Sequence, residues 1–202
     1  MNVLDDSLSP DLVLAGGIDD LLTDRFGALV SYATQSGADG VLFTCSAFGP
    51  AIDVASTHAG VPVFKPNEAM FEEALDLCAG LGRAGRIGMI STFAASVASM
   101  QDELTAIARR RGIEFTLQVE CPAGALEALG QGRVQEHDSL VSGAVSQLLE
   151  NDVLMLGQFS MSHMRNRVAV EARIPALSSP DSAVRLLKKS VEAKLKLFSP
   201  PT

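Results

Sequence analysis

The fold predicted for this chain rests on two stretches, GADGVLFTCSAF at residues 37–48 and ENDVLMLGQFSM at residues 150–161. In each stretch an aspartate, Asp39 or Asp152, precedes a short apolar run, and a polar residue, Cys45 or Gln158, follows six positions later. A short apolar run that ends in a polar turn is typical of a buried parallel strand. The two stretches align without a gap when Cys45 is placed on Gln158, which indicates an internal duplication.

The same offset in residue number relates two further pairs of segments. Residues 61–64 fall on residues 174–177, and both segments have proline in second place. Residues 115–119 fall back on residues 2–6. The partner of 86–91 would lie before Met1, so the first half is expected to lack its opening strand. Three explanations stay open: the given start is truncated, the neighbouring strands close up, or another subunit covers the gap.

Strand and helix patterns alternate along the whole chain. Residues 21–30 and 97–108 carry apolar residues three and four apart and stop at Gly37 and Gly112, which is typical of core-facing helices. Such alternation predicts an α/β fold with parallel sheets covered on both faces. We expect two pseudo-symmetric halves with a cleft between them, one of residues 1–85 with 174–202 and the other of residues 86–173. The expected strands are residues 2–5, 40–44, 61–64, 86–91, 114–119, 153–157 and 174–177.

Charge and composition exclude several classes of function. The formal net charge of −8 argues against a nucleic-acid or anionic-membrane surface, because both need a basic face. The sequence contains no run of about eighteen apolar residues, so it predicts no transmembrane helix. The acidic N-terminus does not resemble a signal peptide. The three cysteines are too few and too scattered for a disulfide framework or a zinc site. We therefore expect a cytoplasmic protein without a metal.

Cys45 and Gln158 are the strongest candidates for chemistry. Ligands of parallel α/β sheets bind beyond the carboxyl ends of the strands, where both residues start a strand-to-helix turn. Backbone N–H groups at a helix start attract carboxylates. If the halves are related by a pseudo-twofold axis, both residues would reach one ligand, and Cys45 would act as acid or base beside a carboxylate. The opposing interpretation of Cys45 is a buried small apolar residue, the commoner fate of a free cysteine.

Further residues are expected around these two positions. The predicted carboxylate cradle consists of the residues after Cys45 and Gln158, namely Ser46, Ala47, Phe159 and Ser160. Ser91 and Thr92 end a strand and would contact a carboxylate, with N-capping as the alternative. Phe93 would line either the pocket or the core. The weaker candidates are Lys65, Ser178 and His163, whereas Cys78 lies in a core helical stripe and Cys121 follows a strand end.

These motifs resemble those of the aspartate/glutamate racemase superfamily. Cys45-Ser46 is similar to its first-half cysteine motif, and Leu156-Gly157-Gln158 is similar to its second-half Leu-Gly-Cys motif. RIGMIST at residues 86–92 resembles the strand that opens the second half, whose trailing hydroxyl groups help to hold a substrate carboxylate. The resemblance covers nearly the whole chain. The superfamily includes amino-acid and hydantoin racemases, maleate isomerase and arylmalonate decarboxylase, which need no metal and no pyridoxal cofactor.

The chain departs from the racemase pattern at Gln158, which stands in place of the second cysteine and cannot exchange a proton near neutral pH. The resemblance therefore implies a cofactor-independent enzyme with Cys45 as its single acid or base. Decarboxylation, isomerisation or elimination fits better than two-base racemisation, and addition of the thiol to a double bond is a further option. It also implies a small carboxylate substrate and a homodimer.

The sequence leaves two other classes of function to consider. One is a non-catalytic protein that binds a small carboxylate, or an inactive remnant of the family, because the second cysteine and the first strand are missing. The other is a flavodoxin-like or receiver module. The receiver is disfavoured, because Cys45, Lys65 and Gln158 stand at the predicted strand ends where it would need clustered acidic residues.

Overall fold

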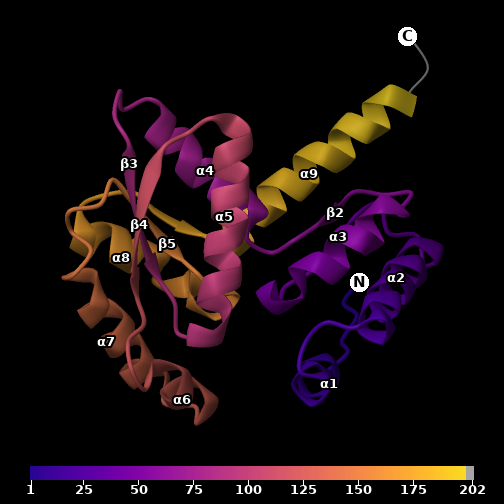
Figure 1. Ribbon diagram of the computed structural model, residues 1–202, viewed down its shortest axis with the longest axis horizontal. Coiled ribbons are helices and arrows are strands. Elements are labelled where there is room, and N and C mark those ends of the chain that lie inside the picture. The colour runs from indigo at the N-terminus through magenta and orange to yellow at the C-terminus, as the bar shows by residue number, and fades with distance from the viewer. Residues whose placement is uncertain (199–202) are drawn as a thin grey trace. The chain divides into compact units, whose positions relative to one another are not determined.

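The computed structural model describes residues 1–198 and divides into two compact units (Figure 1). Among the described residues, unit 1 comprises Met1–Pro66 and 183–198, and unit 2 comprises Asn67–Ser182. This division differs from the boundaries expected from the sequence, which assign residues 67–85 and 174–182 to the first half. These segments belong with unit 2 because helix α4 (Glu68–Ala79) contributes to its core and strand β6 (Ala176–Ser178) pairs with β5 (Val153–Leu156). The last residues of the expected half, 199–202, lie outside the described residues.

Unit 2 contains a four-stranded parallel sheet, which confirms the predicted α/β class. The strand order is β4-β3-β5-β6, with β3 at Gly85–Ile90 and β4 at Phe115–Glu120. All three pairings are parallel. The helical elements of this unit besides α4 are η2 (Ala94–Ser96), α5 (Val97–Arg111), α6 (Ala125–Gly130), α7 (Val134–Val145), η3 (Phe159–Met164) and α8 (Arg165–Ala172).

Helices cover both faces of this sheet, because β5 is apolar on each side. Val153 and Met155 pack into one core with α4 and α5. Leu154 and Leu156 pack into a second core with α7, η3 and α8. A strand whose side chains are buried on both faces reads as a continuous apolar run, and all four residues of β5 are buried.

Unit 1 contains two short parallel strands, β1 (Val41–Leu42) and β2 (Val63–Phe64). Its core is formed by Phe26 of α2 (Asp20–Gln35) and Phe48 of η1 (Ser46–Phe48), whose rings lie 5.0 Å apart. The other helices are α1 (Leu8–Ala15), α3 (Gly49–Thr57) and, from Ala183 onward, α9 (Ser179–Phe198). Leu187 and Val191 of α9 lie against Gly40, where a Cβ atom would come within 2.6 Å of the Leu187 side chain.

The two helices predicted from apolar spacing are confirmed as α2 and α5. The N-cap of α2 is Asp19, whose carboxylate accepts a hydrogen bond from the backbone N–H of Leu22 at 2.8 Å. Helix α5 ends at Gly112, which adopts a left-handed conformation with φ of 64° and donates its N–H to the carbonyl groups of Ala108 and Arg109. Glycine suits this position because it has no Cβ to clash there.

The strand expected at residues 2–5 is not formed, and that prediction is wrong. Its counterpart in the repeat is β4, which is held in place by parallel pairing with β3 along its whole length. A strand needs a hydrogen-bonded neighbour, so the short apolar run Val3-Leu4 is not sufficient to form one.

The two sheets share one register at the offset that places Cys45 on Gln158. Val41 pairs with Val63 in unit 1, and Leu154 pairs with Ala176 in unit 2. The N–H of Val41 donates to Pro62 O at 2.8 Å, and that of Leu154 donates to Pro175 O at 2.9 Å. This agreement supports the duplication as an interpretation of the chain.

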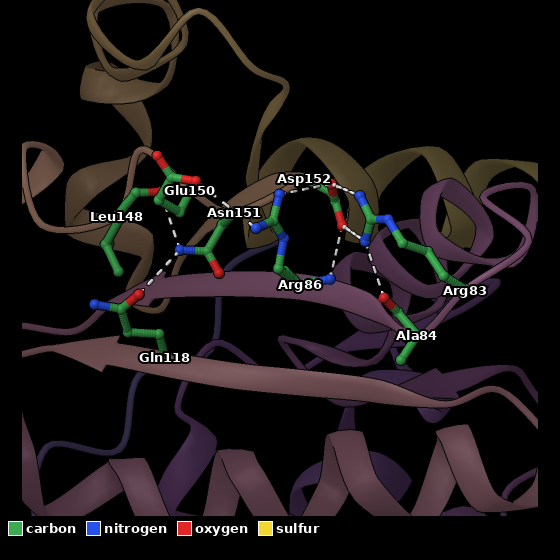
Figure 2. A network of polar contacts seen from close by, with 8 residues as sticks. All are labelled: Arg83, Ala84, Arg86, Gln118, Leu148, Glu150, Asn151 and Asp152. Atoms are coloured by element: carbon green, nitrogen blue, oxygen red, sulfur yellow. Dashed lines mark hydrogen bonds and ion pairs between the residues drawn. The ribbon is translucent and has the colours of Figure 1, made fainter.

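Asp152 fixes the amino-terminal ends of β3 and β5 (Figure 2). Its carboxylate accepts two hydrogen bonds from Arg83, at 2.6 and 2.8 Å, and one from the backbone N–H of Arg86 at 2.8 Å. The Arg83 hydrogen bonds lower the pKa of Asp152 to about 2, against the opposing effect of partial burial. The aspartate that marks the start of this sequence motif therefore clamps two neighbouring strands.

Within the described part of the chain, none of the helices is long and apolar enough to span a membrane.

Candidate functional site

Cys45 lies three residues beyond the carboxyl end of β1 and is exposed. Its backbone is extended, with φ of −113° and ψ of 123°, and it is followed by η1 and then by α3, which has Pro50 in its first turn. Proline suits this place because its fixed φ fits a helix start and its missing N–H would have no partner there. The thiol is therefore held at a strand-to-helix turn, as the sequence predicts.

Lys65 lies next to the start of the helix that follows Cys45. It comes directly after β2, and a Cβ atom on Gly49 would lie 3.9 Å from its side-chain carbon Cδ. Its ammonium group forms an ion pair with Asp53 of α3 at 3.0 Å, and its side chain is only 17% exposed. The positive charge of Lys65 therefore lies near the carboxyl end of β2 and near the start of α3.

Gln158 is the centre of a hydrogen-bond cluster in unit 2. Its Oε1 accepts from the backbone N–H of Thr92 at 2.7 Å and from the Thr92 hydroxyl at 3.3 Å. Its Nε2 donates to the hydroxyl groups of Ser91 at 2.9 Å and Ser96 at 3.2 Å. The backbone N–H can only donate, so it fixes which end of the amide is oxygen. Both lone pairs of the oxygen and both N–H groups are thus used within the protein.

The hydroxyl groups around Gln158 are bonded to the turn after β3. Ser91 Oγ donates to Phe93 O at 3.2 Å and accepts from Phe93 N at 3.3 Å, and Ser96 Oγ donates to Phe93 O at 2.9 Å. Ser91 and Ser96 are buried, whereas the Phe93 side chain is 41% exposed. The structure therefore brings together Ser91, Thr92 and Gln158, and it places the Phe93 ring at the surface rather than in the core.

The other two thiols belong to Cys78 and Cys121, and their surroundings raise the pKa of each. Cys78 is buried in α4, and burial and then the Asp152 charge raise its pKa, which agrees with the core position predicted for it. Cys121 directly follows β4 and is exposed as a residue. Partial burial of its thiol raises its pKa, with a smaller lowering by a hydrogen bond from Ser91 and a further raising by the Glu120 charge. A thiol that stays protonated is a weak nucleophile.

Ser178 and Ser160 occupy the strand end and the turn where the sequence places them. Ser178 ends β6 and donates to Asp181 at 2.7 Å, which is a local contact at the start of α9. Ser160 is the second residue of η3, after Phe159, and its carbonyl contacts Nδ1 of His163 at 3.0 Å. In the first half, Ser46 and Ala47 form the first two residues of η1.

Asn67 is a polar residue that the sequence did not single out as a ligand group. It lies beyond β2, directly before α4, and is 1% exposed. Its Oδ1 accepts from Ser179, and its Nδ2 has no hydrogen-bond partner among the described residues. A buried N–H donor without a hydrogen-bond partner is energetically costly, so the Nδ2 group of Asn67 stands out among the polar groups near the strand ends. Its position after Pro66, at the end of an apolar run, could have indicated it.

His163 takes part in a cluster with His137 and Asp138. Asp138 Oδ1 contacts Nε2 of His163 and Nδ1 of His137, each at 2.8 Å, and His137 is fully buried. Partial burial would raise the pKa of Asp138, but the hydrogen bonds from both histidines lower it. Their ligand atoms all lie within 4.8 Å of one another, so these three residues could hold a metal ion. The contacts themselves have the lengths of hydrogen bonds.

The Asp/Glu/Hydantoin racemase family model matches residues 16–187, which is most of the chain. No curated protein sequence matches this chain. Among solved structures, an allantoin racemase from Klebsiella pneumoniae is similar at 20% identity with a TM-score of 0.61. The match covers 85% of this chain and 66% of the racemase, so this chain spans slightly less than two thirds of that protein.

Two other enzymes have a similar fold. A glutamate racemase from Bacillus anthracis is 14% identical with a TM-score of 0.62, and the match covers 85% of this chain and 66% of that one. An arylmalonate decarboxylase is also 14% identical, with a TM-score of 0.60 and coverage of 85% and 77%. At such identities the likeness concerns the fold, and the family match carries the assignment. The chain belongs to the Asp/Glu/hydantoin racemase family.

Proposed function

We propose that this protein is a cofactor-independent enzyme that uses the Cys45 thiol for proton transfer at a carbon next to a carboxylate. The observation that carries the proposal is the exposed Cys45 at the strand-to-helix turn beyond β1, in a member of the Asp/Glu/hydantoin racemase family. The backbone N–H groups of Ser46 and Ala47 would bind one carboxylate oxygen, because the first N–H groups of a helical turn lack intrahelical partners.

The proposed chemistry is one-sided. Gln158 cannot take up or release a proton near neutral pH, so Cys45 is the single acid or base. In a decarboxylation, the C–C bond to one carboxylate breaks, carbon dioxide leaves, and the electron pair stays on carbon as an enediolate. The Cys45 thiol donates its proton to that carbon, and the thiolate recovers a proton from water. In an isomerisation, the Cys45 thiolate would instead add to a carbon–carbon double bond of the substrate and would later be expelled as that double bond forms again.

The residues around Gln158 are proposed to form a carboxylate-binding site of unit 2. Because the amide of Gln158 is saturated by Thr92, Ser91 and Ser96, we assign it a positioning role. It would hold the Thr92 and Ser91 hydroxyl groups in place for a carboxylate, while Phe93, Phe159 and Ser160 would line the pocket. Lys65, near the helix that follows Cys45, would attract an anionic substrate. Ser178 and His163 remain weaker candidates.

The second candidate function is a small-carboxylate-binding protein without catalysis. It is favoured by the saturation of Gln158, because the place of the second family cysteine is occupied by an amide bonded within the protein. The cytoplasmic location and the homodimer stay predictions of the sequence.

The test is the alkylation rate of Cys45 by iodoacetamide in a Cys78→Ser and Cys121→Ser background, measured against pH. A catalyst should react faster at pH 7 than free cysteine, and malonate or maleate should slow the reaction. Malonates, maleate and amino acids are then screened in deuterium oxide for solvent deuterium at the carbon beside the carboxylate, with Cys45→Ser as control. A slow reaction that no carboxylate affects would refute both candidates, whereas protection without turnover would leave the binding protein.

A further inference from the structure

We propose that His137, Asp138 and His163 of unit 2 form a binding site for a divalent transition-metal cation such as Zn²⁺. Each residue offers one nitrogen or oxygen ligand atom, and these atoms all lie within 4.8 Å of one another. The proposed ion joins helix α7 to η3, the turn after Gln158, and takes no part in the chemistry proposed for Cys45. The two proposals can therefore fail separately.

One apolar core holds the two elements that carry these ligands. The first two ligands are neighbours on α7, and the third lies in η3. Val141 of α7 lies one helical turn after His137 and packs in the same buried cluster as Met161 and Met164. These two methionines belong to η3 and lie on either side of His163 along the chain. The ligand atoms are therefore held close together by packing, as a preorganised metal site requires.

The distances around Asp138 suit a small cation. Its Oδ1 lies 2.8 Å from Nδ1 of His137 and 2.8 Å from Nε2 of His163. Zinc binds nitrogen and oxygen atoms at about 2.0–2.2 Å in a tetrahedral arrangement, which places neighbouring ligand atoms about 3.3 Å apart. Each of the two contacts therefore has to lengthen by only about 0.5 Å to reach that spacing. The His163 side chain is 47% exposed, so it has room for this adjustment.

The hydrogen-bond partners of His163 favour a cation over a simple ion pair with Asp138. Its Nε2 faces the Asp138 carboxylate, and its Nδ1 lies 3.0 Å from the carbonyl oxygen of Ser160. A carbonyl oxygen and an ionised carboxylate can only accept, whereas a neutral imidazole has a single N–H to donate. A cation on Nε2 resolves this conflict, because Nδ1 then keeps the proton for Ser160. Metal-bound histidines commonly donate their other N–H to a backbone carbonyl.

The burial of His137 supports the same assignment. Its side chain is fully buried, and its Nε2 has no hydrogen-bond partner in the part of the chain that the structure describes. Its Nδ1 points to Asp138 and so into the cluster. Burial of a polar ring is costly unless its nitrogen gains a strong partner, and a bond from Nδ1 to a cation would offset that cost.

The ligand atoms also select the class of ion. Two imidazole nitrogens and one carboxylate oxygen suit Zn²⁺ and related transition metals such as Co²⁺ and Ni²⁺. Mg²⁺ and Ca²⁺ are instead bound by oxygen atoms. Three protein ligands leave a coordination position for water, which can enter on the exposed side of His163. The formal net charge of −8 makes the protein as a whole attractive to cations.

Zinc binding to the full-length protein tests the proposal. The background is Cys45→Ser with Cys121→Ser, because both thiols are exposed and would bind zinc themselves. After treatment with EDTA and its removal, isothermal titration with zinc chloride should show one ion bound per chain, and magnesium chloride should show none. A titration without a saturable one-to-one phase would overturn the proposal. Since Cys45 is absent from this background, the result does not depend on the proposed catalysis.

Two histidine variants make the test specific for the site. His163→Ala should weaken zinc binding at least about tenfold, because the loss of a ligand costs no less than the loss of a group that orients one. His58→Ala is the matched control, since His58 is an exposed histidine of unit 1 whose ring contacts Thr57 and Val54, and it should leave the affinity unchanged. Circular dichroism checks that both variants fold. Unchanged affinity in His163→Ala, or an equal loss in both variants, would contradict the assignment.

Nitrogen-15 chemical shifts of the imidazole rings identify the ligand atoms directly. Zinc should shift the resonances of His163 Nε2 and His137 Nδ1, and His163 Nδ1 should stay protonated. Asp138→Asn should reduce these shifts at the same zinc concentration, because the carboxylate ligand is lost. Shifts confined to His58 would show that zinc binds elsewhere and would overturn the proposal.

Discussion

The side-chain oxygen of Gln158 accepts a hydrogen bond from the backbone N–H of Thr92 at 2.7 Å. This bond joins the turn after β5 to the turn after β3, two neighbouring strands of one parallel sheet. Gln158 therefore acts as a structural connection between these two turns.

Gln158→Met should destabilise the protein by about 1–3 kcal/mol, because the N–H of Thr92 and the hydroxyl groups of Ser91 and Ser96 lose their partner. Urea unfolding followed by circular dichroism measures the change. Gln131→Met is the matched control, since Gln131 is exposed on the surface and should change stability by less than about 0.5 kcal/mol. Equal effects at the two positions would contradict the structural role of Gln158.

The three cysteines should differ in their reaction with iodoacetamide. Cys45 should be modified first and Cys121 more slowly, because partial burial of its thiol raises its pKa. Cys78 should react only after unfolding, since it is 2% exposed and burial raises its pKa as well. Mass spectrometry of peptides after timed quenching measures the order. Modification of Cys78 in the native protein at the rate of Cys45 would show that the core of unit 2 is open.

Asp152 should contribute stability that is lost at low pH. Its pKa in the folded protein is about 2, below the ordinary value of 3.8, so its contribution is present above about pH 4 and disappears as the pH falls toward 2. Because the carboxylate is partly exposed, we expect about 1 kcal/mol. Asp152→Asn should remove this dependence in urea unfolding between pH 2 and 6. Glu150→Gln, whose carboxylate is 92% exposed, is the control that should retain it.

Gly85→Ala should destabilise unit 2 by about 1–3 kcal/mol, the usual effect of overpacking a core. A Cβ at this position would lie 2.2 Å from Sγ and 2.4 Å from Cβ of Cys78, so α4 would have to move away from β3. Gly143→Ala in α7 has open space around it and should instead be neutral or stabilise by up to about 1 kcal/mol. Thermal unfolding compares the two variants, and a Gly85→Ala variant as stable as Gly143→Ala would mean that helix α4 moves away from β3 at little cost.

Lys65→Gln should weaken the protection of Cys45 by malonate about threefold to tenfold, because a nearby cation attracts a dianion. The effect should shrink in about 0.5 M salt, where charges are screened over a few ångströms. Lys188→Gln, at an exposed position of α9, is the control and should leave protection unchanged. Unchanged protection in Lys65→Gln would limit this lysine to its ion pair with Asp53.

The sequence by itself determined the α/β class, the parallel strands and the helices α2 and α5. These elements depend on local apolar spacing and on caps such as Gly112, which act within a few residues along the chain. The positions of Cys45 and Gln158 in the turns after two strands are determined in the same way, because a strand and its turn are contiguous.

Tertiary structure decided everything that requires a partner distant in sequence. Residues 2–5 were expected to form a strand but form none, because apolar residues make a strand only when a neighbouring strand is paired with them. The bonds that saturate Gln158 come from Thr92, Ser91 and Ser96, which lie far earlier in the sequence. His163 likewise meets Asp138, 25 positions away, instead of joining the Gln158 cluster. Apolar spacing is set by neighbouring residues, but the partners of a side chain are set by how the strands and helices pack.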